Sequence, residues 1–289
     1  MSTVQRYLKS LSMLGEAVIF RHSLFSLPFA LSAILLESNG HPSLKKTLLI
    51  IIAVSAGRNA ANALNRVIDA DFDSLNPRTV SRHIPQRLLS KQSLLIFAAI
   101  LGGILVLATA LLSTVCLVLL PFAILLIGTY SFSKRFTWLC HYWLGFACSC
   151  SVMGSFIALS GYVSFRHIVL TVAHAFWVAG FDILYALPDI HFDRQEDLYS
   201  IPAEFGATPA RIIAFLSHIV TILCLFAVPA LWTVSRWYML AALCSALLLI
   251  AEHCIACGNT ERHIRIASYS INEILPLVIF GGVCLGVYV

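Results

Sequence analysis

Two short acidic motifs, 120 residues apart, carry the residue types best suited to chemistry in this chain. They read Asn65-xxx-Asp69-xxx-Asp73 and Tyr185-xxx-Asp189-xxx-Asp193. Of the 14 acidic residues in the 289-residue chain, nine lie in or near these motifs. Such a concentration of carboxylates in an otherwise apolar sequence indicates that they act together.

The spacing of four residues predicts how these side chains are presented. Residues four apart lie above one another on a helix, about 6 Å from step to step. Each motif is therefore expected to place its side chains on one stripe. The first stripe also includes Arg58 and Asn62, and the second also includes Asp182. We expect the two stripes to face each other across one cavity, because charged residues in membrane spans normally face protein or water.

Carboxylates that face one another repel strongly in a medium of low dielectric constant and require cations between them. Hard oxygen ligands favour Mg²⁺, which shares its coordination sphere with substrate phosphates. We therefore predict that Asp69, Asp73, Asp189 and Asp193 bind Mg²⁺ and, through it, a diphosphate. Asn65 is expected to orient the diphosphate or a metal-bound water, the alternative being a hydrogen bond to a neighbouring helix.

Basic residues in the neighbouring loops are suited to neutralise the remaining phosphate charge. These candidates are Arg78, Lys134, Arg135 and Arg194. For Lys134 and Arg135 the membrane topology is an equally good explanation of the charge.

The composition shows what kind of elements position these residues. Hydrophobic residues make up 59% of the chain and charged residues 11%, and the mean hydropathy is +0.87. These values are typical of an integral membrane protein rather than a soluble one. Spans of about 20 apolar residues cross a bilayer as helices. We predict an all-α fold with nine spans, near 18–36, 47–67, 93–112, 114–131, 142–162, 167–187, 211–233, 237–256 and 266–288.

Charge asymmetry predicts the orientation of these spans. With the first end in the cytoplasm, cytoplasmic segments hold 14 of the 19 basic residues and outer segments hold four, with Arg58 inside a span. The positive-inside rule therefore places both acidic motifs on the cytoplasmic side. Residues 1–20 are interpreted as an amphipathic segment on the membrane surface and not as a cleavable signal.

The equal offset between the motifs indicates internal symmetry. Asp69 to Asp189 and Asp73 to Asp193 are separated by the same distance, and the motifs follow the second and sixth spans. This pattern predicts two related four-helix halves and a last helix, in one domain covering residues 1–289. The polar loops 74–92 and 194–210 are expected to form short helices that cap the mouth of the cavity.

The motifs resemble those of the UbiA family of intramembrane prenyltransferases. Its first signature corresponds to residues 65–73 (NRVIDADFD), 76–79 (NPRT) and 82–85 (RHIP), and its second to residues 180–194 (GFDILYALPDIHFDR). Supporting similarity lies at residues 27–30, at Tyr130, at Lys134-Arg135 and at residues 200–206. The form of the second signature is most similar to bacterial 4-hydroxybenzoate polyprenyltransferases, a branch that includes enzymes of the futalosine route to menaquinone. The sequence departs from the pattern at Pro188 and His191, and we expect Pro188 to bend the sixth span.

The resemblance implies a helical bundle around a lipid-accessible cavity in which two Asp-rich motifs bind Mg²⁺. It also implies transfer of a prenyl group from a polyprenyl diphosphate to an acceptor, commonly an aromatic hydroxy acid in ubiquinone or menaquinone biosynthesis, in the bacterial inner membrane. The carboxylate of such an acceptor needs a cation, and Arg58 and Arg21 are the candidates within or near a span. Arg58 could instead pair with Asp182, and Arg21 could reach lipid phosphates. Tyr185 is expected to steady the second motif, the alternative being a hydrogen bond to a neighbouring helix. Asp182 and Tyr185 are further candidates for contact with the acceptor.

Some features of the sequence also occur in proteins with other functions. A secondary transporter also carries acids within its spans, although usually near the middle of the bilayer. Transferases that act on haem, chlorophyll or archaeal lipids are alternatives within the same family. A metal site at His253, Cys254, Cys257 and His263 is disfavoured, because such spacing arises by accident in a chain with nine cysteines. The net charge of +5 follows from topology and indicates no nucleic-acid partner. The acceptor, the tail length and the oligomeric state stay open.

Overall fold

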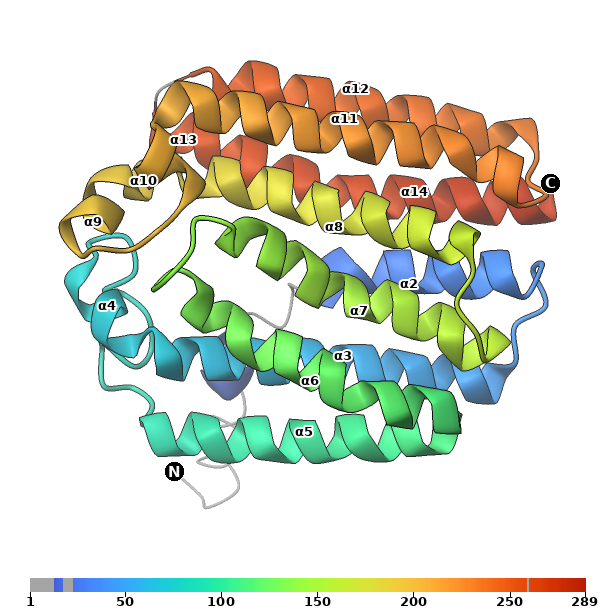
Figure 1. Ribbon diagram of the computed structural model, residues 1–289, viewed down its shortest axis with the longest axis horizontal. Coiled ribbons are helices and arrows are strands. Elements are labelled where there is room, and N and C mark those ends of the chain that lie inside the picture. Colours follow the sequence, from blue (N-terminus) through green and yellow to red (C-terminus); the bar gives the residue numbers. More distant parts are fainter. Residues whose placement is uncertain (1–12, 18–22, 259) are drawn as a thin grey trace, which may run out of the picture.

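The computed structural model describes residues 13–17, 23–258 and 260–289, and the regular structure in these residues is entirely helical (Figure 1). Arg21 and most of the predicted interfacial segment lie outside them. The elements are α2 (Ser23–Glu37), α3 (Leu44–Ile68), α4 (Ala70–Leu75), α5 (Lys91–Leu112), α6 (Thr114–Ser133), α7 (Cys140–Ser160), α8 (Phe165–Tyr185), η2 (Leu187–Asp189), α9 (Ile190–Gln195), α10 (Ile201–Phe205), α11 (Ala207–Leu231), α12 (Arg236–Ala256), α13 (Glu261–Arg265), η3 (Ile266–Ile271) and α14 (Asn272–Tyr288).

Eight helices in the described residues are long and apolar enough to cross a membrane, and the last of them runs from Arg262 to Tyr288 through α13, η3 and α14. The first predicted span corresponds to α2, whose 15 residues extend about 22 Å. That length is less than the roughly 30 Å hydrocarbon core of a bilayer. The all-helical membrane fold is confirmed, whereas the predicted count of nine spans is not reached within the residues described.

Local sequence explains where the spans end. Residues 93–133 contain no charge, yet the chain breaks at Ser113, where the hydroxyl accepts a hydrogen bond from the backbone N–H of Cys116 and caps α6. The predicted hairpin at Ser113-Thr114 is therefore present. Helix α7 ends at Gly161, whose φ of +79° is a left-handed conformation that a residue with a side chain rarely adopts.

The bundle has two layers of long helices, with α2 between them (Figure 1). Helices α3, α5, α6 and α7 lie on one side, and α8, α11, α12 and α14 lie on the other. The largest buried side chains of the core, which include Phe29, Phe156, Trp177 and Tyr238, join α2 and α7 to the second group. The short helices α4, α9 and α10 gather at one end of the bundle.

Both acidic motifs lie where a long helix breaks at that end. Asp69 separates α3 from α4 with φ −91° and ψ 1°, and Asp189 separates η2 from α9 with φ −88° and ψ 0°. Each motif continues into a helix of six residues. The backbone changes direction at Asp69, but the N–H of Asp73 still donates to the oxygen of Asp69 at 2.8 Å, so the four-residue spacing of the predicted stripe continues across the break. The expected bend at Pro188 is present as η2. The matching backbone at equivalent positions agrees with internal symmetry.

The two capping segments differ from each other. Turns fill the first segment from Asn76 to Ser90, so the helix expected between α4 and α5 is absent from these described residues. The left-handed φ of +55° at Arg87 contributes to this path. The second segment contains the end of α9, then α10, which Ser200 caps by accepting a hydrogen bond from the N–H of Ala203.

Candidate active site

A polar cavity of about 380 Å³ opens at the end of the bundle where α4, α9 and α10 gather. Its lining brings together most of the residues singled out in the sequence: Arg58, Asn65, Asp69, Asp73, Arg78, Lys134, Arg135, Asp182, Tyr185, Asp189 and Asp193. These side chains come from α3, α4, α8, α9 and the loops beside them. The two motifs therefore face one cavity.

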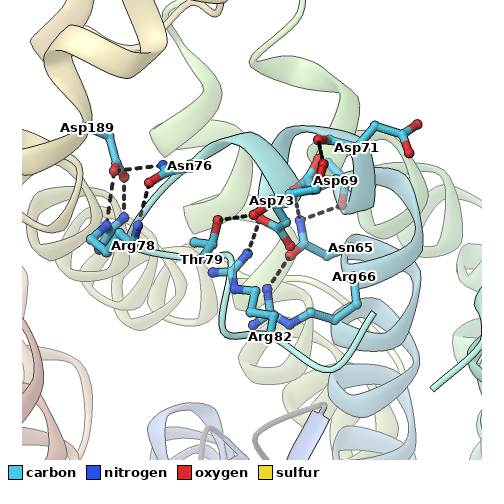
Figure 2. A network of polar contacts seen from close by, with 12 residues as sticks. Asn65, Arg66, Asp69, Asp71, Asp73, Asn76, Arg78, Thr79, Arg82 and Asp189 are labelled. Atoms are coloured by element: carbon cyan, nitrogen blue, oxygen red, sulfur yellow. Dashed lines mark hydrogen bonds and ion pairs between the residues drawn. The ribbon is translucent and has the colours of Figure 1, made fainter. Parts of the chain in front are cut away.

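The first motif is held by amide and guanidinium groups. Asn65 donates a hydrogen bond of 2.6 Å to Asp69, four residues further along the chain. Arg82, from the turn segment after α4, donates to Asp73 at 2.6 Å. Figure 2 shows Arg82 turned toward Asp73 and Asn65 lying beside Asp69. The loop after the motif thus folds back onto it.

The second motif receives a basic residue from the same loop. Arg78 binds Asp189 through two nitrogens, one of them Nε at 3.0 Å, and Asn76 donates to the same carboxylate at 3.1 Å (Figure 2). Asp193 accepts a hydrogen bond of 2.8 Å from Ser200, and its Oδ2 lies 3.7 Å from Lys134 Nζ. One loop therefore links the two motifs, with Arg82 on the first and Arg78 on the second.

Burial and neighbouring charges shift the pKa values of side chains in the cavity. Burial, and then the neighbouring Asp73, raise the pKa of Asp69 to about 6. Burial opposes the charge of Lys134, but Asp193 and other acids outweigh this effect and raise the pKa of the ammonium group. The cavity therefore favours bound cations and disfavours a further negative charge unless cations accompany it.

The donor set fits a hard divalent cation. Within the described part of the chain, no three His, Cys, Asp or Glu side chains are arranged as a ready-made ligand set. The four aspartates are instead engaged by arginine, lysine, asparagine and serine. Asp73 Oδ2 is buried and has no hydrogen-bond partner in the part of the chain that the structure describes, which leaves a strong acceptor available. Carboxylate oxygens of this kind suit Mg²⁺.

Arg58 lies deeper, at the junction of two cavities. It lines the polar cavity and also an apolar cavity of about 340 Å³ between α3, α5, α6 and α7. Its Nη1 donates to the sulfur of Cys148 at 2.5 Å, whereas its Nε is buried and has no hydrogen-bond partner among the described residues. Asp182, the alternative partner of Arg58, lines the same cavity and has its Oδ2 2.7 Å from His141 Nδ1.

Some predicted residues lie elsewhere or have other contacts. Arg194 does not line the cavity and donates to the backbone oxygen of Ala203 at 2.6 Å. Arg135 lines the cavity but donates to the last carbonyl of α3, on Ile68, at 2.9 Å. Tyr185 lies under Arg78, with the guanidinium carbon 4.2 Å from the ring centre. At the end of α12 and just after it, Cys254 and Cys257 are exposed and His253 contacts His218, and among the described residues these side chains are not arranged as a ligand set.

Several cavity residues were not predicted. Asn76 and Arg82 belong to the polar run after the first motif, and that position was the signal by which they could have been found. Tyr269 stands in an apolar span, and nothing in its spacing distinguishes it from residues that pack between helices. Only the fold brings it to the cavity. His141, also in an apolar span, contacts the cavity residue Asp182.

Sequence comparison identifies the family and the relatives of this chain. The sequence pattern of the UbiA prenyltransferase family matches residues 26–271. A 4-hydroxybenzoate octaprenyltransferase from Vibrio cholerae is 30% identical over 262 residues, which cover 89% of each chain. One from Vesicomyosocius okutanii is 28% identical over 255 residues, covering 88% of this chain and 93% of the relative.

Solved structures show the same fold. A UbiA homologue from Aeropyrum pernix K1, solved without ligand, has a TM-score of 0.83 and 30% identity over 91% of this chain and 97% of that one. A UbiA homologue from Archaeoglobus fulgidus bound to GPP and Mg²⁺ has a TM-score of 0.67 and 16% identity over 94% and 98% of the two chains. The resemblance drawn from the motifs is confirmed, as is the prediction of an enzyme. This chain is a membrane-embedded prenyltransferase that belongs to the UbiA prenyltransferase family.

Proposed function

We propose that this protein transfers a polyprenyl group from a polyprenyl diphosphate to 4-hydroxybenzoate, with Mg²⁺ as cofactor. The observation that carries the proposal is the single cavity in which both aspartate motifs, the basic residues Arg78 and Lys134, and the deeper Arg58 meet. The names of the related octaprenyltransferases support the choice of acceptor. Transport of a solute is no longer a competing explanation, because the family is one of transferases.

The diphosphate would occupy the polar cavity. Mg²⁺ held by Asp69, Asp73, Asp189 and Asp193 would supply neutralisation of the charge on the leaving diphosphate. The guanidinium groups that now bind Asp73 and Asp189 are close enough to move to phosphate oxygens when those carboxylates take another partner. Arg82 and Arg78 would then offset the remaining charge, and Lys134 would do so from the opposite wall.

The prenyl tail would occupy the apolar cavity. Its lining is almost entirely apolar and comes from α3, α5, α6 and α7, two of which, α5 and α6, are largely exposed along their length. A tail of any length can continue from such a site into lipid. The same apolar walls would exclude water, which would otherwise trap the allylic cation formed as the C–O bond breaks.

Arg58 would hold the acceptor between these two regions. A guanidinium pairs with a carboxylate in a bidentate manner and stays charged when buried. The buried Nε without a partner and Nη1, which has only a weak sulfur acceptor, are the donors available to such a carboxylate. The activated ring would then attack the cation at the cavity junction and lose a proton. Arg21, outside the described residues, stays a second proposed cation.

The test is prenyl transfer by membranes that contain the protein, with radiolabelled polyprenyl diphosphate, with Mg²⁺ or with a chelator. We expect transfer to 4-hydroxybenzoate only when the metal is present. Product analysis with a hydroxynaphthoate in parallel distinguishes the alternative acceptor of a menaquinone pathway. Full activity in the chelator, or in both the Asp69→Ala and the Asp189→Ala variant, would overturn the proposed roles of the aspartates.

We also propose that the protein lies in the bacterial inner membrane, with the cavity mouth and N-terminus in the cytoplasm. The excess of basic residues in the predicted inner segments supports this orientation. Nine spans place Val289 on the outer side, and eight place it in the cytoplasm. Alkaline phosphatase fused after Val289 is expected to be active, because it folds only outside the cytoplasm. If the phosphatase fusion is inactive and a separate fusion of green fluorescent protein after Val289 is fluorescent, this topology is contradicted.

A further inference from the structure

The last span contains an irregular turn beside the active site. Residues Ile266–Ile271 form the π-helical turn η3, between α13 and α14. Two of its residues, Ser268 and Tyr269, line the polar cavity. A π-helical turn accommodates an extra residue in a helix and is frequently found at functional sites.

Asn272, at the end of this turn, holds it in place. Its side-chain nitrogen donates to the backbone oxygens of Ala267 at 3.2 Å and Ser268 at 3.3 Å, which satisfies carbonyls near the widened turn. The same nitrogen donates to Glu252 of α12 at 2.8 Å, and its oxygen accepts from Trp177 of α8 at 2.6 Å. Asn272 is fully buried. It therefore closes the turn and also ties it to two neighbouring helices.

The turn changes which residues share a face. In a regular α-helix, residues three apart point the same way, so Tyr269 and Asn272 would be directed toward the same neighbours. Here Asn272 is directed into the core between α8 and α12, whereas Tyr269 is directed to the catalytic cavity. The irregular turn is the feature that allows both orientations.

Tyr269 reaches the second aspartate motif through two side chains. Its ring meets that of Tyr185 edge to face, with 5.3 Å between the centroids and 85° between the planes. The other partner of Tyr185 is Arg78, whose guanidinium carbon is 4.2 Å from the ring centre and which binds Asp189. Burial opposes the charge of Arg78, but Tyr185, Asp189 and Tyr269 together raise its pKa.

We propose that Tyr269 is a positioning residue for Arg78, and that η3 and Asn272 are present to hold it against Tyr185. The inference rests on the proposed function, in which Arg78 leaves Asp189 and binds the diphosphate. The ion pair with Asp189 is lost in that exchange, whereas the contact with the face of Tyr185 can persist. Tyr269 braces that face, so the guanidinium stays at the cavity in both states.

The matched variants are Tyr269→Leu, which removes the ring, and Tyr269→Phe, which keeps it. Tyr288→Phe is the control, because it removes a hydroxyl at the other end of the same span, where Tyr288 donates to Gly40 at 2.6 Å. We expect Tyr269→Leu to raise the KM for polyprenyl diphosphate by up to roughly tenfold, the limit set by full loss of the Arg78–Tyr185 cation–π contact that Tyr269 supports, and to leave the KM for the aromatic acid unchanged. Tyr288→Phe should retain wild-type values, and Tyr269→Phe, which keeps the ring contact with Tyr185, should raise the KM for polyprenyl diphosphate less than Tyr269→Leu does.

A double variant tests whether Tyr269 acts through Arg78. Arg78→Gln alone should raise the KM for the diphosphate, and adding Tyr269→Leu should raise it no further, because the two changes remove one contact. Independent, multiplying effects would overturn the inference, as would an equal rise in both KM values. If Tyr269→Leu fails to fold, Tyr185→Leu serves instead and should show the same selective change.

A binding measurement separates this inference from the reaction itself. Inorganic pyrophosphate with Mg²⁺ is expected to raise the thermal unfolding midpoint of the detergent-solubilised protein. The rise should be smaller for Tyr269→Leu than for wild type and Tyr288→Phe at the same pyrophosphate concentration. Wild-type transfer with an unchanged shift in Tyr269→Leu would refute the positioning role but leave the proposed function intact. If the wild-type protein shows neither a rise in the unfolding midpoint with pyrophosphate nor prenyl transfer, the proposed function itself is refuted.

Discussion

Replacing Arg58 with methionine is expected to abolish use of the aromatic acid without destabilising the fold. In the structure this guanidinium has one side-chain acceptor, the Cys148 sulfur at 2.5 Å, and a buried Nε without a partner. A thiol sulfur is a weak acceptor, and an unsatisfied buried donor costs about 1–3 kcal/mol. Methionine removes that donor and fills much of the same space. The free energy of unfolding should therefore stay unchanged or rise by up to about 2 kcal/mol.

The activity of Arg58→Met with the aromatic acid should fall, even though its stability does not. Loss of one partner from a buried ion pair costs about 3–5 kcal/mol, and the bound acceptor's carboxylate would be left without its cation. This corresponds to a fall of a few hundred- to a few thousand-fold in kcat/KM for the acid. Binding of the diphosphate should not change, since Arg58 lies at the deep end of the cavity and the aspartates lie at its mouth.

Three measurements on detergent-solubilised protein check this prediction. They are the thermal unfolding midpoint, prenyl transfer at varied acid concentration, and stabilisation by pyrophosphate with Mg²⁺. Arg58→Lys is the matched control, because it keeps the charge but loses the fork that pairs with a carboxylate, and it should fall between wild type and Arg58→Met. A lowered midpoint in Arg58→Met with unchanged use of the acid would show that Arg58 stabilises the fold and does not bind the acceptor.

Three further predictions concern the aspartates and the π-helical turn. Asp189→Asn keeps the shape of the side chain but removes the charge, so we expect prenyl transfer to fall at least roughly a hundredfold at fixed Mg²⁺. Wild-type rates at ordinary Mg²⁺ concentrations would contradict this. The raised pKa of Asp69, about 6, means that the metal-free protein gains stability from its protonated carboxyl at low pH and loses it as pH rises through about 6. Mg²⁺ binds the ionised carboxylate, so the apparent affinity of the protein for Mg²⁺ should increase as the pH rises. Mg²⁺ titrations at pH 5 and pH 7.5 measure this change, and equal affinities at the two pH values would refute it. Asn272→Leu removes the hydrogen bonds that Asn272 makes with Glu252, Trp177 and two backbone carbonyls, and it should lower the free energy of unfolding by about 2–4 kcal/mol. An unchanged unfolding midpoint would refute the role of Asn272.

Much of the candidate site could be predicted because its signals are local. Asp69 and Asp189 stand out by charge in apolar surroundings, and their equal spacing to Asp73 and Asp193 predicts matched environments. The structure places matching helix breaks at the two positions. Arg194 shows the limit of such reasoning: it is adjacent to Asp193 in sequence, but α9 directs it to the backbone of α10.

The sequence by itself determined that the chain is a helical membrane protein, because burial of backbone polar groups in lipid leaves a long apolar chain few other choices. It also predicted that the two acidic motifs lie at one cavity, because carboxylates are costly in such a chain unless they face protein or water. Only the tertiary structure decided which basic residues meet those acids. Arg78 and Arg82 reach the two motifs from the turn segment after α4, and Tyr269 lines the same cavity from the π-helical turn that Asn272 ties to α8 and α12. Contacts between residues distant in sequence have no periodicity, so no local pattern predicts them.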